Sequence, residues 1–514
     1  MKNTTRRIWF VAFVVSLGGF LFGFDAGIIS GVMAYAGPEF NLDDIQTGWV
    51  VSSPSFAAML TMLFSGRLSD FFGRKKILIA VAFLYALSAL LSAYAVSYDM
   101  LWIARMIGGI AFGAALILAP MYIAEISSVD NRGKLVAVQQ LNIVLGFFAA
   151  FLSNYYLNEL NTSGDSFLKD ETVWRWMLGL EILPAVLYFI LMFFVPNSPR
   201  WLFLKQREDE ARIILNDLHG IEKAKVEAQS IKDNIEKQSN KQKVTLKELV
   251  IPPLRYIFLV GLILGILQQI TGINAIYFYA TSIFKLTGIG TNAAFASGVL
   301  LSTIAVIATI VSMLTIDRFG RRPLAILGIG GIALSMLICG YGFKQATYEL
   351  SPDKLEQLDS NLQGKLTPYI NKSYSNDLDF VKAMKGALGV DIYNKNSGAI
   401  LEAAAKINST LILVGILLFI ACFGFSLGPV MWVMLSEMYP NKYRGLAIGV
   451  IGFVNSFSSW LVQQVFPWEL SNLGNATTFF IFGFVALVGF FLFLKILPET
   501  KGKSLEELEQ ELTI

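Results

Sequence analysis

Long apolar stretches alternate with short polar segments along the whole chain. Each stretch has 18 or more residues, enough for a helix to cross a bilayer core of roughly 30 Å. Twelve of them lie near 8–32, 47–66, 77–97, 101–124, 135–157, 174–195, 255–280, 294–316, 323–343, 410–435, 445–467 and 476–497. This pattern predicts an all-α membrane protein with 12 transmembrane helices.

The composition agrees with a membrane protein. Of the 514 residues, 55% are hydrophobic and only 15% are charged, whereas soluble proteins carry about 25% charged residues. The first stretch is too long for a cleavable signal peptide. Both cysteines, Cys339 and Cys422, lie inside apolar stretches, so no disulfide framework is expected.

Basic residues gather in the loops on one side of the predicted bundle. The loops at 33–46 and 95–100, on the other side, carry acidic charges only. Since short cytoplasmic loops are enriched in Lys and Arg, we expect both termini in the cytoplasm and a multi-pass protein of the cell (inner) membrane. The basic side carries Arg6, Arg7, Arg67, Arg74, Lys75, Lys76, Arg132, Lys134, Arg200, Arg318, Arg321, Arg322, Lys442, Arg444, Lys501 and Lys503.

Three loop motifs occur twice, in the same order and after corresponding stretches. The pairs are SDFFGRKK (69–76) with IDRFGRRP (316–323), EISSVDNRG (125–133) with EMYPNKYRG (437–445), and PNSPR (196–200) with PETKG (498–502). Two six-helix halves related in this way are the parallel repeat of the major facilitator fold. The repeat predicts an N-terminal half over 1–199, a cytoplasmic helical linker over 200–252 and a C-terminal half over 253–514.

The second half contains an insertion. Asp70 and Asp317 are 247 residues apart, whereas Glu125 and Glu437 are 312 residues apart. About 65 residues are therefore inserted between Asp317 and Glu437. The polar segment at 344–409 is the place for them, on the outer side. Its leucines and alanines favour short helices.

One carboxylate interrupts the first apolar stretch. In GGFLFGFDAGIISG (18–31), glycines recur every four residues and suit close helix contact, while Asp25 lies on the opposite face. An ionised Asp at mid-membrane costs at least about 2.5–3.5 kcal/mol, so a partner is expected. Arg105 and Glu181 lie at a similar depth, because Asp25 is about 26 Å from the cytoplasmic start of its helix and Arg105 about 9 Å from the outer start of its own.

Two interpretations of this cluster remain open. It is either a static ion pair that fixes helix register, or a proton site. In a proton site, Asp25 is charged beside Arg105 and takes up a proton when the pair separates, because an opposite charge favours the ionised form and burial disfavours it.

A second polar set consists of neutral side chains in otherwise apolar stretches. Gln140, Gln268, Gln269, Asn274 and Asn455 are amides, which both donate and accept hydrogen bonds. Trp432 adds an indole that can stack, Gly272 predicts a helix break, and Gly428 with Pro429 predicts a kink. An anionic substrate would require arginines and a cation would require carboxylates, so the set favours a neutral ligand with many hydroxyl groups. Any single amide could instead serve only as an interhelix hydrogen bond.

The sequence contains no catalytic constellation. It has no phosphate-binding loop and no metal-ligand spacing, and the one histidine, His219, lies in the linker. We therefore expect no enzyme activity, no metal, no cofactor and no nucleic-acid partner.

The quoted motifs resemble those of the sugar porter family of the major facilitator superfamily, closest to bacterial proton-coupled monosaccharide symporters. The resemblance extends over essentially the whole chain and includes PMYIAEISSVDNRGKL, QQITGIN and GPVMWVMLSEMYPNKYRG. It implies alternating access by a monomer that imports a neutral monosaccharide with a proton. Two alternatives stay open: a facilitative sugar or inositol uniporter, and a sugar sensor that does not transport.

The resemblance also implies roles for individual residues. Proton coupling would involve Asp25, Arg105 and Glu181. Sugar would bind Phe22, Gln140, Gln268, Gln269, Asn274, Gly428, Trp432 and Asn455. The cytoplasmic gating network would comprise Asp70, Arg74, Glu125, Arg132, Asp317, Arg321, Glu437 and Arg444. Phe147, Phe278 and Ala305 stand where sugar-binding members often have Gln, Tyr and Asn, which leaves the sugar open.

Overall fold

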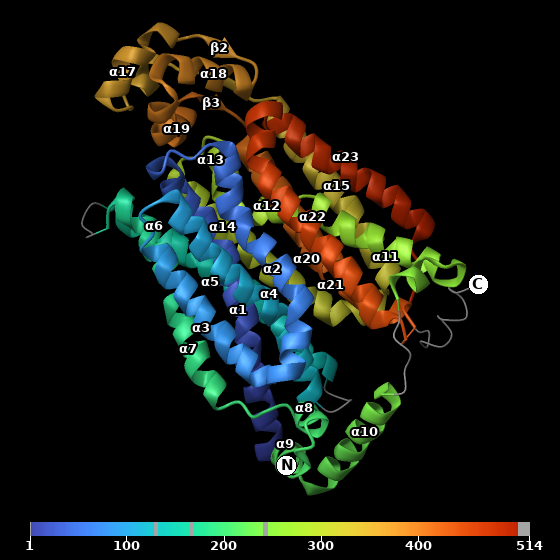
Figure 1. Cartoon of the computed structure of the whole chain (residues 1–514). Helices are drawn as coiled ribbons and strands as arrows, with labels where there is room; N and C mark the ends of the chain where they lie inside the picture. The colour runs from blue at the N-terminus through green and yellow to red at the C-terminus, as the bar shows by residue number, and fades with distance from the viewer. Residues whose placement is uncertain (1, 128–131, 164–167, 240–244, 441, 502–514) are drawn as a thin grey trace. The chain divides into compact units, whose positions relative to one another are not determined.

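The computed structural model describes residues 2–127, 132–163, 168–239, 245–440 and 442–501 (Figure 1). In this part of the chain, 12 helical segments are long and apolar enough to cross a membrane, which confirms the predicted number. The first six are formed by α1 (Lys2–Glu39), α2 (Asp44–Phe72), α3 (Arg74–Ala93), α4 (Tyr98–Ile126), α5 (Arg132–Thr162) and α6 (Asp170–Gly179) with α7 (Ile182–Phe193). The last six are formed by α11 (Pro252–Ile270) with α12 (Ile273–Phe278), α14 (Thr291–Phe319), α15 (Arg321–Lys344), α20 (Ser409–Phe425) with α21 (Leu427–Met438), α22 (Arg444–Leu473) and α23 (Asn475–Ile496).

The sixth and seventh spans are each interrupted, for different local reasons. Between α6 and α7, the break at Leu180 lies four residues before Pro184, which has no N–H to bond to the Leu180 carbonyl. Between α11 and α12, Gly272 adopts a left-handed conformation with φ +96°, which a residue without Cβ adopts readily. The break predicted at Gly272 is therefore confirmed, while the break beside Glu181 was not expected. A further short helix, α13 (Ala280–Lys285), follows α12.

The tenth span is interrupted at Ser426, between α20 and α21. The sequence placed a kink at Gly428 and Pro429, two or three residues later. The observed position follows from the same proline, because Pro429 cannot donate to the carbonyl of Phe425, four residues earlier.

Contacts divide the chain into two compact units. The first comprises Met1–Asp25, Ser53–Phe147 and Leu178–Glu248, and the second comprises Ala26–Ser52, Phe148–Met177 and Leu249–Ile514. The predicted outer ends of α1, α2, α5 and α6 thus belong to the same unit as the C-terminal helices. The boundaries at 199 and 253, which came from the sequence repeat, remain a prediction.

The glycine stripe of α1 is a site of close helix contact, as the sequence predicted. A Cβ added at Gly23 would lie only 1.9 Å from the carbonyl oxygen of Ile143 in α5. From the other side, a Cβ at Gly146 would lie 2.1 Å from the carbonyl oxygen of Phe20. The backbones of α1 and α5 therefore touch, and the opposite face of α1, with Asp25, is free to meet α4.

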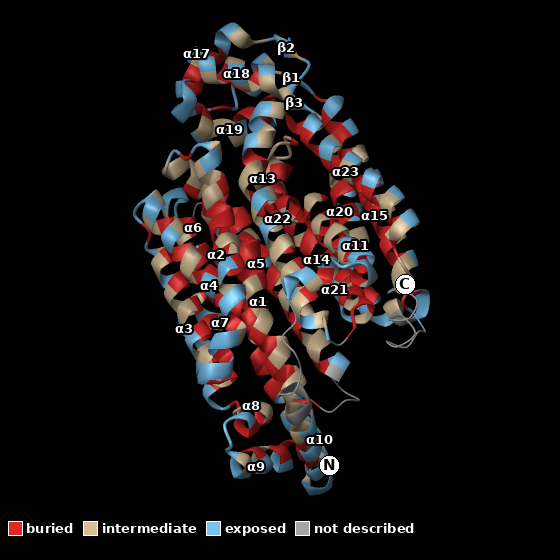
Figure 2. Cartoon of the chain, turned by 45° about the vertical axis from the view of Figure 1, so that its right-hand side comes forward, coloured by how far each residue is buried: buried red, intermediate tan, exposed pale blue. Residues whose placement is uncertain are grey.

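In the second unit, α15 packs against α20 and α23, and α11 packs against α22. Exposed residues recur along the spans of both units (Figure 2). They include large apolar side chains, among them Phe64 and Leu183 in the first unit and Leu314 and Phe484 in the second. Exposed apolar surface on this scale is what a lipid environment covers.

The inserted segment forms a small α/β domain with its own core. Its elements are β1 (Thr347–Glu349), α16 (Pro352–Leu355), α17 (Ser360–Leu366), η2 (Thr367–Tyr369), β2 (Ser373–Tyr374), α18 (Asp377–Leu388), α19 (Val390–Ala404) and β3 (Ala405–Lys406). The sheet has the antiparallel order β2-β1-β3. Since β1 follows α15 and β3 precedes α20, their pairing joins the ends of these two spans. The short helices were expected, and the strands were not.

The linker is helical, as expected. It contains α8 (Pro199–Leu204), α9 (Glu208–His219), α10 (Ile221–Ser239) and the short η1 (Leu246–Val250). Trp201, Leu202, Leu215 and Ala224 form a small core that holds α8, α9 and α10 together.

Candidate functional site

The structure brings Asp25 and Arg105 together inside the first unit. The guanidinium donates from Nη1 to Oδ1 of Asp25 at 3.1 Å and from Nη2 to Oδ2 at 3.4 Å, so the pair is bidentate. Asp25 is 5% exposed and Arg105 is 1% exposed. Glu181 is 3% exposed and interacts electrostatically with both. Two carboxyl groups and one guanidinium therefore share a buried site.

Two buried tyrosines lie close to this cluster, and sequence reasoning missed both. Tyr85 donates its hydroxyl hydrogen to the carbonyl oxygen of Gly18 at 3.0 Å and interacts electrostatically with Asp25 and Glu181. The hydroxyl of Tyr188 has no hydrogen-bond partner among the described residues. A signal was available, because Tyr188 follows Glu181 by seven residues, or about two helical turns on the same face.

The predicted amides of the C-terminal spans form one network in the second unit. Asn455 of α22 donates to the oxygens of Gln268 at 2.8 Å and of Gly265 at 2.8 Å. Gln269 donates to Gln268 Oε1 at 3.3 Å and to Asn455 Oδ1 at 3.2 Å. Gln268 in turn donates to the carbonyl oxygens of Leu427 at 3.0 Å and Gly428 at 3.4 Å. The first turn of α21, directly after the break at Ser426, thus supplies acceptors to the network.

The network continues to two residues that the sequence analysis did not select. Asn274 of α12 donates to Gln269 Oε1 at 2.8 Å and to the hydroxyl oxygen of Ser459 at 2.5 Å. Gln463 donates to the same Ser459 oxygen at 2.9 Å. The pattern was visible in the sequence, because Asn455, Ser459 and Gln463 are four residues apart and lie on one face of α22.

The remaining residues of the predicted sugar site are divided between the two units, Trp432 in the second and Phe22 and Gln140 in the first. Trp432 of α21 is 45% exposed, which leaves its indole free to meet a ligand. Phe22 packs against Phe112 with ring centroids 4.8 Å apart and against Phe147 at 6.4 Å. Gln140 is half-buried on α5.

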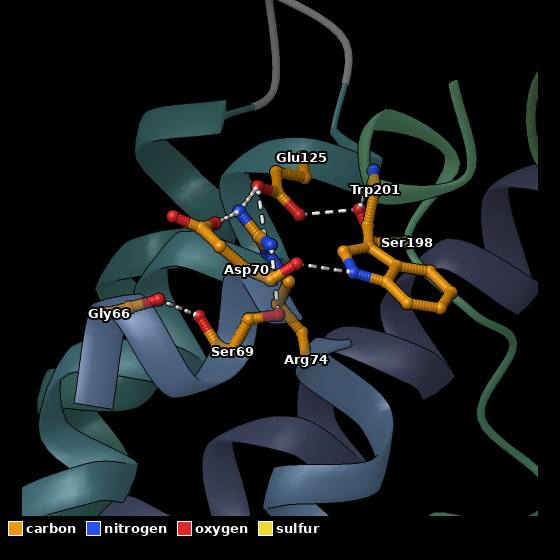
Figure 3. Close-up of polar contacts among 7 residues, drawn as sticks. All are labelled: Gly66, Ser69, Asp70, Arg74, Glu125, Ser198 and Trp201. Atoms are coloured by element: carbon orange, nitrogen blue, oxygen red, sulfur yellow. Dashed lines mark hydrogen bonds and ion pairs between the residues drawn. The ribbon is translucent and has the colours of Figure 1, made fainter. Parts of the chain in front are cut away.

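The predicted cytoplasmic network contains an arginine–glutamate–hydroxyl triad in the N-terminal half (Figure 3). Arg74 contacts Asp70 Oδ1 at 2.8 Å and Glu125 Oε1 at 3.1 Å. The second oxygen of Glu125 accepts a hydrogen bond from the hydroxyl of Ser198. The indole of Trp201 donates to the carbonyl oxygen of Asp70 at 3.1 Å and attaches α8 to the end of α2 beside this triad.

The C-terminal half repeats the same arrangement. Arg321 contacts Glu437 Oε1 at 2.9 Å, and Thr500 donates to the second oxygen of Glu437 at 2.6 Å. Arg444 donates to the carbonyl oxygen of Tyr439 at 3.0 Å. The side chains of Arg132 and Asp317 lie outside the described residues. Ser198 and Thr500, which the sequence analysis missed, occupy matching positions in PNSPR and PETKG.

Within the described part of the chain, no group of three or more His, Cys, Asp and Glu side chains could hold a metal ion. The polar groups that the fold brings together can exchange hydrogen bonds and hold a proton.

Comparison with known proteins identifies the family. The profile of the family described as "Sugar (and other) transporter" matches residues 11–351 and 384–512. The major myo-inositol transporter of Bacillus subtilis (strain 168) is 33% identical over 502 residues, which cover 97% of this chain and 93% of that protein. The arabinose-proton symporter of the same organism is 31% identical over 500 residues, or 97% and 94% of the two chains. The glucose transporter of Staphylococcus epidermidis (strain ATCC 12228 / FDA PCI 1200) is 32% identical over 499 residues, or 97% and 95%.

Solved structures agree over nearly the full length. The inward open conformation of the xylose transporter XylE from E. coli has a TM-score of 0.75 at 27% identity and covers 98% of this chain and 100% of its own. The proton:xylose symporter XylE bound to 6-bromo-6-deoxy-D-glucose has a TM-score of 0.69 at 28% identity, with 98% and 99% covered. The chain therefore belongs to the sugar porter family of the major facilitator superfamily, whose members are multi-pass membrane transporters and not enzymes.

Proposed function

We propose that this protein is a secondary active transporter that imports a neutral monosaccharide together with a proton by alternating access. It acts as a monomer in the cell membrane, with both termini in the cytoplasm and two six-helix halves at 1–199 and 253–514. The observation that carries the proton coupling is the buried bidentate pair of Asp25 and Arg105 with Glu181 beside it.

Charge balance supports a proton in this cluster. With both carboxyl groups ionised, the site carries two negative charges against one positive charge. A buried net charge is costly unless it is paired, and one bound proton makes the cluster neutral. When Asp25 takes that proton, Glu181 supplies the anion that Arg105 still requires, so the pair can separate without leaving a buried charge alone.

The amide network supports a neutral sugar as substrate. Its members offer donors and acceptors but no net charge, which suits a ligand that carries hydroxyl groups. The relatives named for myo-inositol, arabinose, glucose and xylose all point to this class of molecule. Two of the names, the arabinose-proton symporter and the proton:xylose symporter, also point to proton coupling.

The two triads support a gating role at the cytoplasmic side. Each one fixes a loop by joining three motifs that are far apart in the sequence, through Arg74, Glu125 and Ser198 in one half and Arg321, Glu437 and Thr500 in the other. We assign them, with Asp70, Arg132, Asp317 and Arg444, to a network that stabilises the state closed on this side.

Uptake into proteoliposomes tests the proposal. Radiolabelled D-xylose, L-arabinose, D-glucose and myo-inositol are offered with and without an inward proton gradient, to wild type and to Asp25→Asn. We expect the gradient to drive accumulation in wild type, and Asp25→Asn to retain only sugar exchange. The matched control is Asp99→Asn, an exposed carboxylate on α4 that accepts from Trp102.

Two results would oppose the proposal. If wild type only equilibrates sugar and Asp25→Asn behaves identically, the ion pair is structural and the protein is a uniporter. If sugar binds but no flux occurs with or without the gradient, the protein is a sensor.

A further inference from the structure

Ser459 occupies an unusual position in the amide network of the second unit. Its hydroxyl oxygen accepts from Asn274 Nδ2 at 2.5 Å and from Gln463 Nε2 at 2.9 Å. One oxygen thus receives two side-chain amides, one from α12 and one from its own helix. A bound sugar also presents hydroxyl groups, and one of them could accept the same amide hydrogen bonds as Ser459.

The partner of Ser459 on α12 is the residue best able to change partners. Asn274 is half-buried, and α12 is only six residues long. The helix lies between Gly272, with a left-handed backbone, and Tyr279, with φ −118° and ψ 17°. Because both flanking residues depart from helical geometry, α12 can shift without breaking a continuous helical ladder on either side.

The rest of the network holds Gln269 in place while Asn274 changes its hydrogen-bond partner. Gln269 donates to Gln268 and Asn455, and its own oxygen accepts from Asn274 at 2.8 Å. A ligand hydroxyl that takes the bond from Asn274 to Ser459 therefore leaves the remaining bonds intact. Without Ser459, the amides of Asn274 and Gln463 would each lose a partner in the ligand-free protein.

We propose that Ser459 is a specificity-determining residue that stands in for a substrate hydroxyl: it occupies the Asn274 amide in the ligand-free protein, and a hydroxyl of the bound sugar displaces it. The inference rests on the proposed sugar-binding function of the same site. Since Ser459 competes with the ligand, only a sugar with a hydroxyl acceptor at this position replaces the lost bond. Ser459 thus lowers affinity for every ligand and most strongly for those that lack that hydroxyl.

Removal of the competitor should tighten binding. In Ser459→Ala, the Asn274 amide keeps its bond to Gln269 but lacks its second internal acceptor until a sugar arrives, so ligand binding no longer breaks a hydrogen bond. We expect the Kd to fall roughly two- to tenfold, the range that one neutral hydrogen bond represents. Loss of a merely structural contact would loosen the site and raise the Kd, so the sign of the change separates the two roles.

The experiment measures equilibrium binding of D-xylose, L-arabinose, D-glucose and myo-inositol to the purified full chain by calorimetry. Ser458→Ala is the matched control, because Ser458 is the neighbouring residue and donates to the carbonyl oxygen of Val454 within its own helix. Ser459→Cys is the second variant, whose thiol keeps the size but is a weak acceptor. It should shift the Kd in the same direction if Ser459→Ala does not fold.

Tighter binding by a Ser459 variant with an unchanged Ser458→Ala supports the inference. Unchanged or weaker binding by the Ser459 variants overturns it, as does an equal gain in Ser458→Ala, which would indicate general loosening of α22. A wild type that binds none of the four ligands overturns the proposed function and this inference together, whereas wild-type binding with unchanged variants overturns the inference alone.

Discussion

Arg105 and Asp25 neutralise each other at a depth where neither is hydrated as in bulk water. Removal of one partner from such a pair leaves a buried charge without compensation, which costs more than the pair itself contributes. The consequence can be measured at the level of single residues, independently of any transport assay.

We expect Arg105→Leu to lower the free energy of unfolding by about 3–5 kcal/mol, the range for breaking a buried ion pair from one side. The double variant Asp25→Leu/Arg105→Leu should recover most of that loss, because it buries no lone carboxylate from Asp25. Thermal unfolding of the purified protein in detergent measures both.

The control is Arg207→Leu, which breaks an exposed pair with Glu210 in the linker and should cost at most about 1 kcal/mol. A double variant as unstable as Arg105→Leu would contradict this account and assign the cost to lost packing of the arginine.

At the scale of elements, the inserted domain stabilises a helix end. Asp377, at the start of α18, accepts a hydrogen bond from the backbone N–H of Asn475 at 2.8 Å and so caps the first turn of α23. Burial raises the pKa of this carboxyl, although its backbone hydrogen bonds act in the opposite direction. The cap therefore holds a charge that its surroundings disfavour.

This pKa gives a prediction with a definite sign. A carboxyl whose pKa is raised on folding stabilises the protein most below its ordinary pKa of 3.8, and the contribution falls as the pH rises through the folded value. Asp377→Asn keeps the acceptor without the charge, so its melting temperature relative to wild type should be higher at pH 7 than at pH 4.

Asp377→Ala provides the comparison, because it removes the acceptor itself. It should therefore be less stable than Asp377→Asn by about 1 kcal/mol, the usual contribution of an N-cap, at both pH values. If the melting temperature of Asp377→Asn differed from that of wild type by the same amount at pH 7 and pH 4, burial would not disfavour the charged form of Asp377.

Some features of the helices and strands were predictable from the sequence, and others were not. The contact between α1 and α5 was predictable, because the glycines at 19, 23, 27 and 31 lie along one face of a single helix and can be recognised in one short stretch of sequence. The break at Gly272 was predictable for the same local reason. The strands β1, β2 and β3 were not, because segments of two or three residues become strands only through pairing between positions as distant as Thr347 and Lys406.

At the scale of the whole molecule, the repeated triads also show that the sequence does not reveal a role that depends on contacts between distant segments. The sequence identified Arg74, Glu125, Arg321 and Glu437 through repeated motifs. It did not identify Ser198 and Thr500, because their role depends on three loops meeting at one glutamate. Similarly, Ser459 resembles any other helical serine until α12 is placed against α22.

The likeness of the two triads predicts equal consequences. Glu125→Gln and Glu437→Gln each remove a charge-assisted hydrogen bond to arginine, worth about 1.5–3 kcal/mol. If the triads stabilise the state closed on the cytoplasmic side, proton-driven sugar uptake should fall roughly tenfold or more, while the Kd of the transported sugar stays within about twofold.

Uptake and binding of the same radiolabelled sugar separate these two effects. Glu210→Gln, in the exposed linker pair, should leave uptake unchanged. An equal loss of uptake and binding in Glu125→Gln would instead indicate that the triad maintains the structure of the sugar site.

The predicted outer ends of α2 and α22 meet within the second unit, and this contact gives the last prediction. Ser52 donates to Gln464 Oε1 at 2.7 Å, and Gln464 Nε2 donates to the carbonyl oxygen of Ile45 at 3.0 Å. Between them, a Cβ added at Gly48 would lie 2.3 Å from the carbonyl oxygen of Gln464. The contact therefore exists only because position 48 has no side chain.

Gly48→Leu should push α2 away from α22 and disfavour the state closed on the outer side. An overpacked contact costs about 1–3 kcal/mol, which corresponds to a roughly five- to hundredfold shift toward the outer-open state. Labelling of Ser52→Cys by a membrane-impermeant maleimide, applied from outside, should accelerate accordingly, and sugar uptake should fall.

Gly66→Leu is the matched control, because Gly66 lies on the same helix and a Cβ there meets nothing within 4 Å. It should leave both labelling and uptake as in the parent protein. If Gly48→Leu lowered uptake without changing the labelling of position 52, the contact between α2 and α22 would not be the closure that separates the sugar site from the outside.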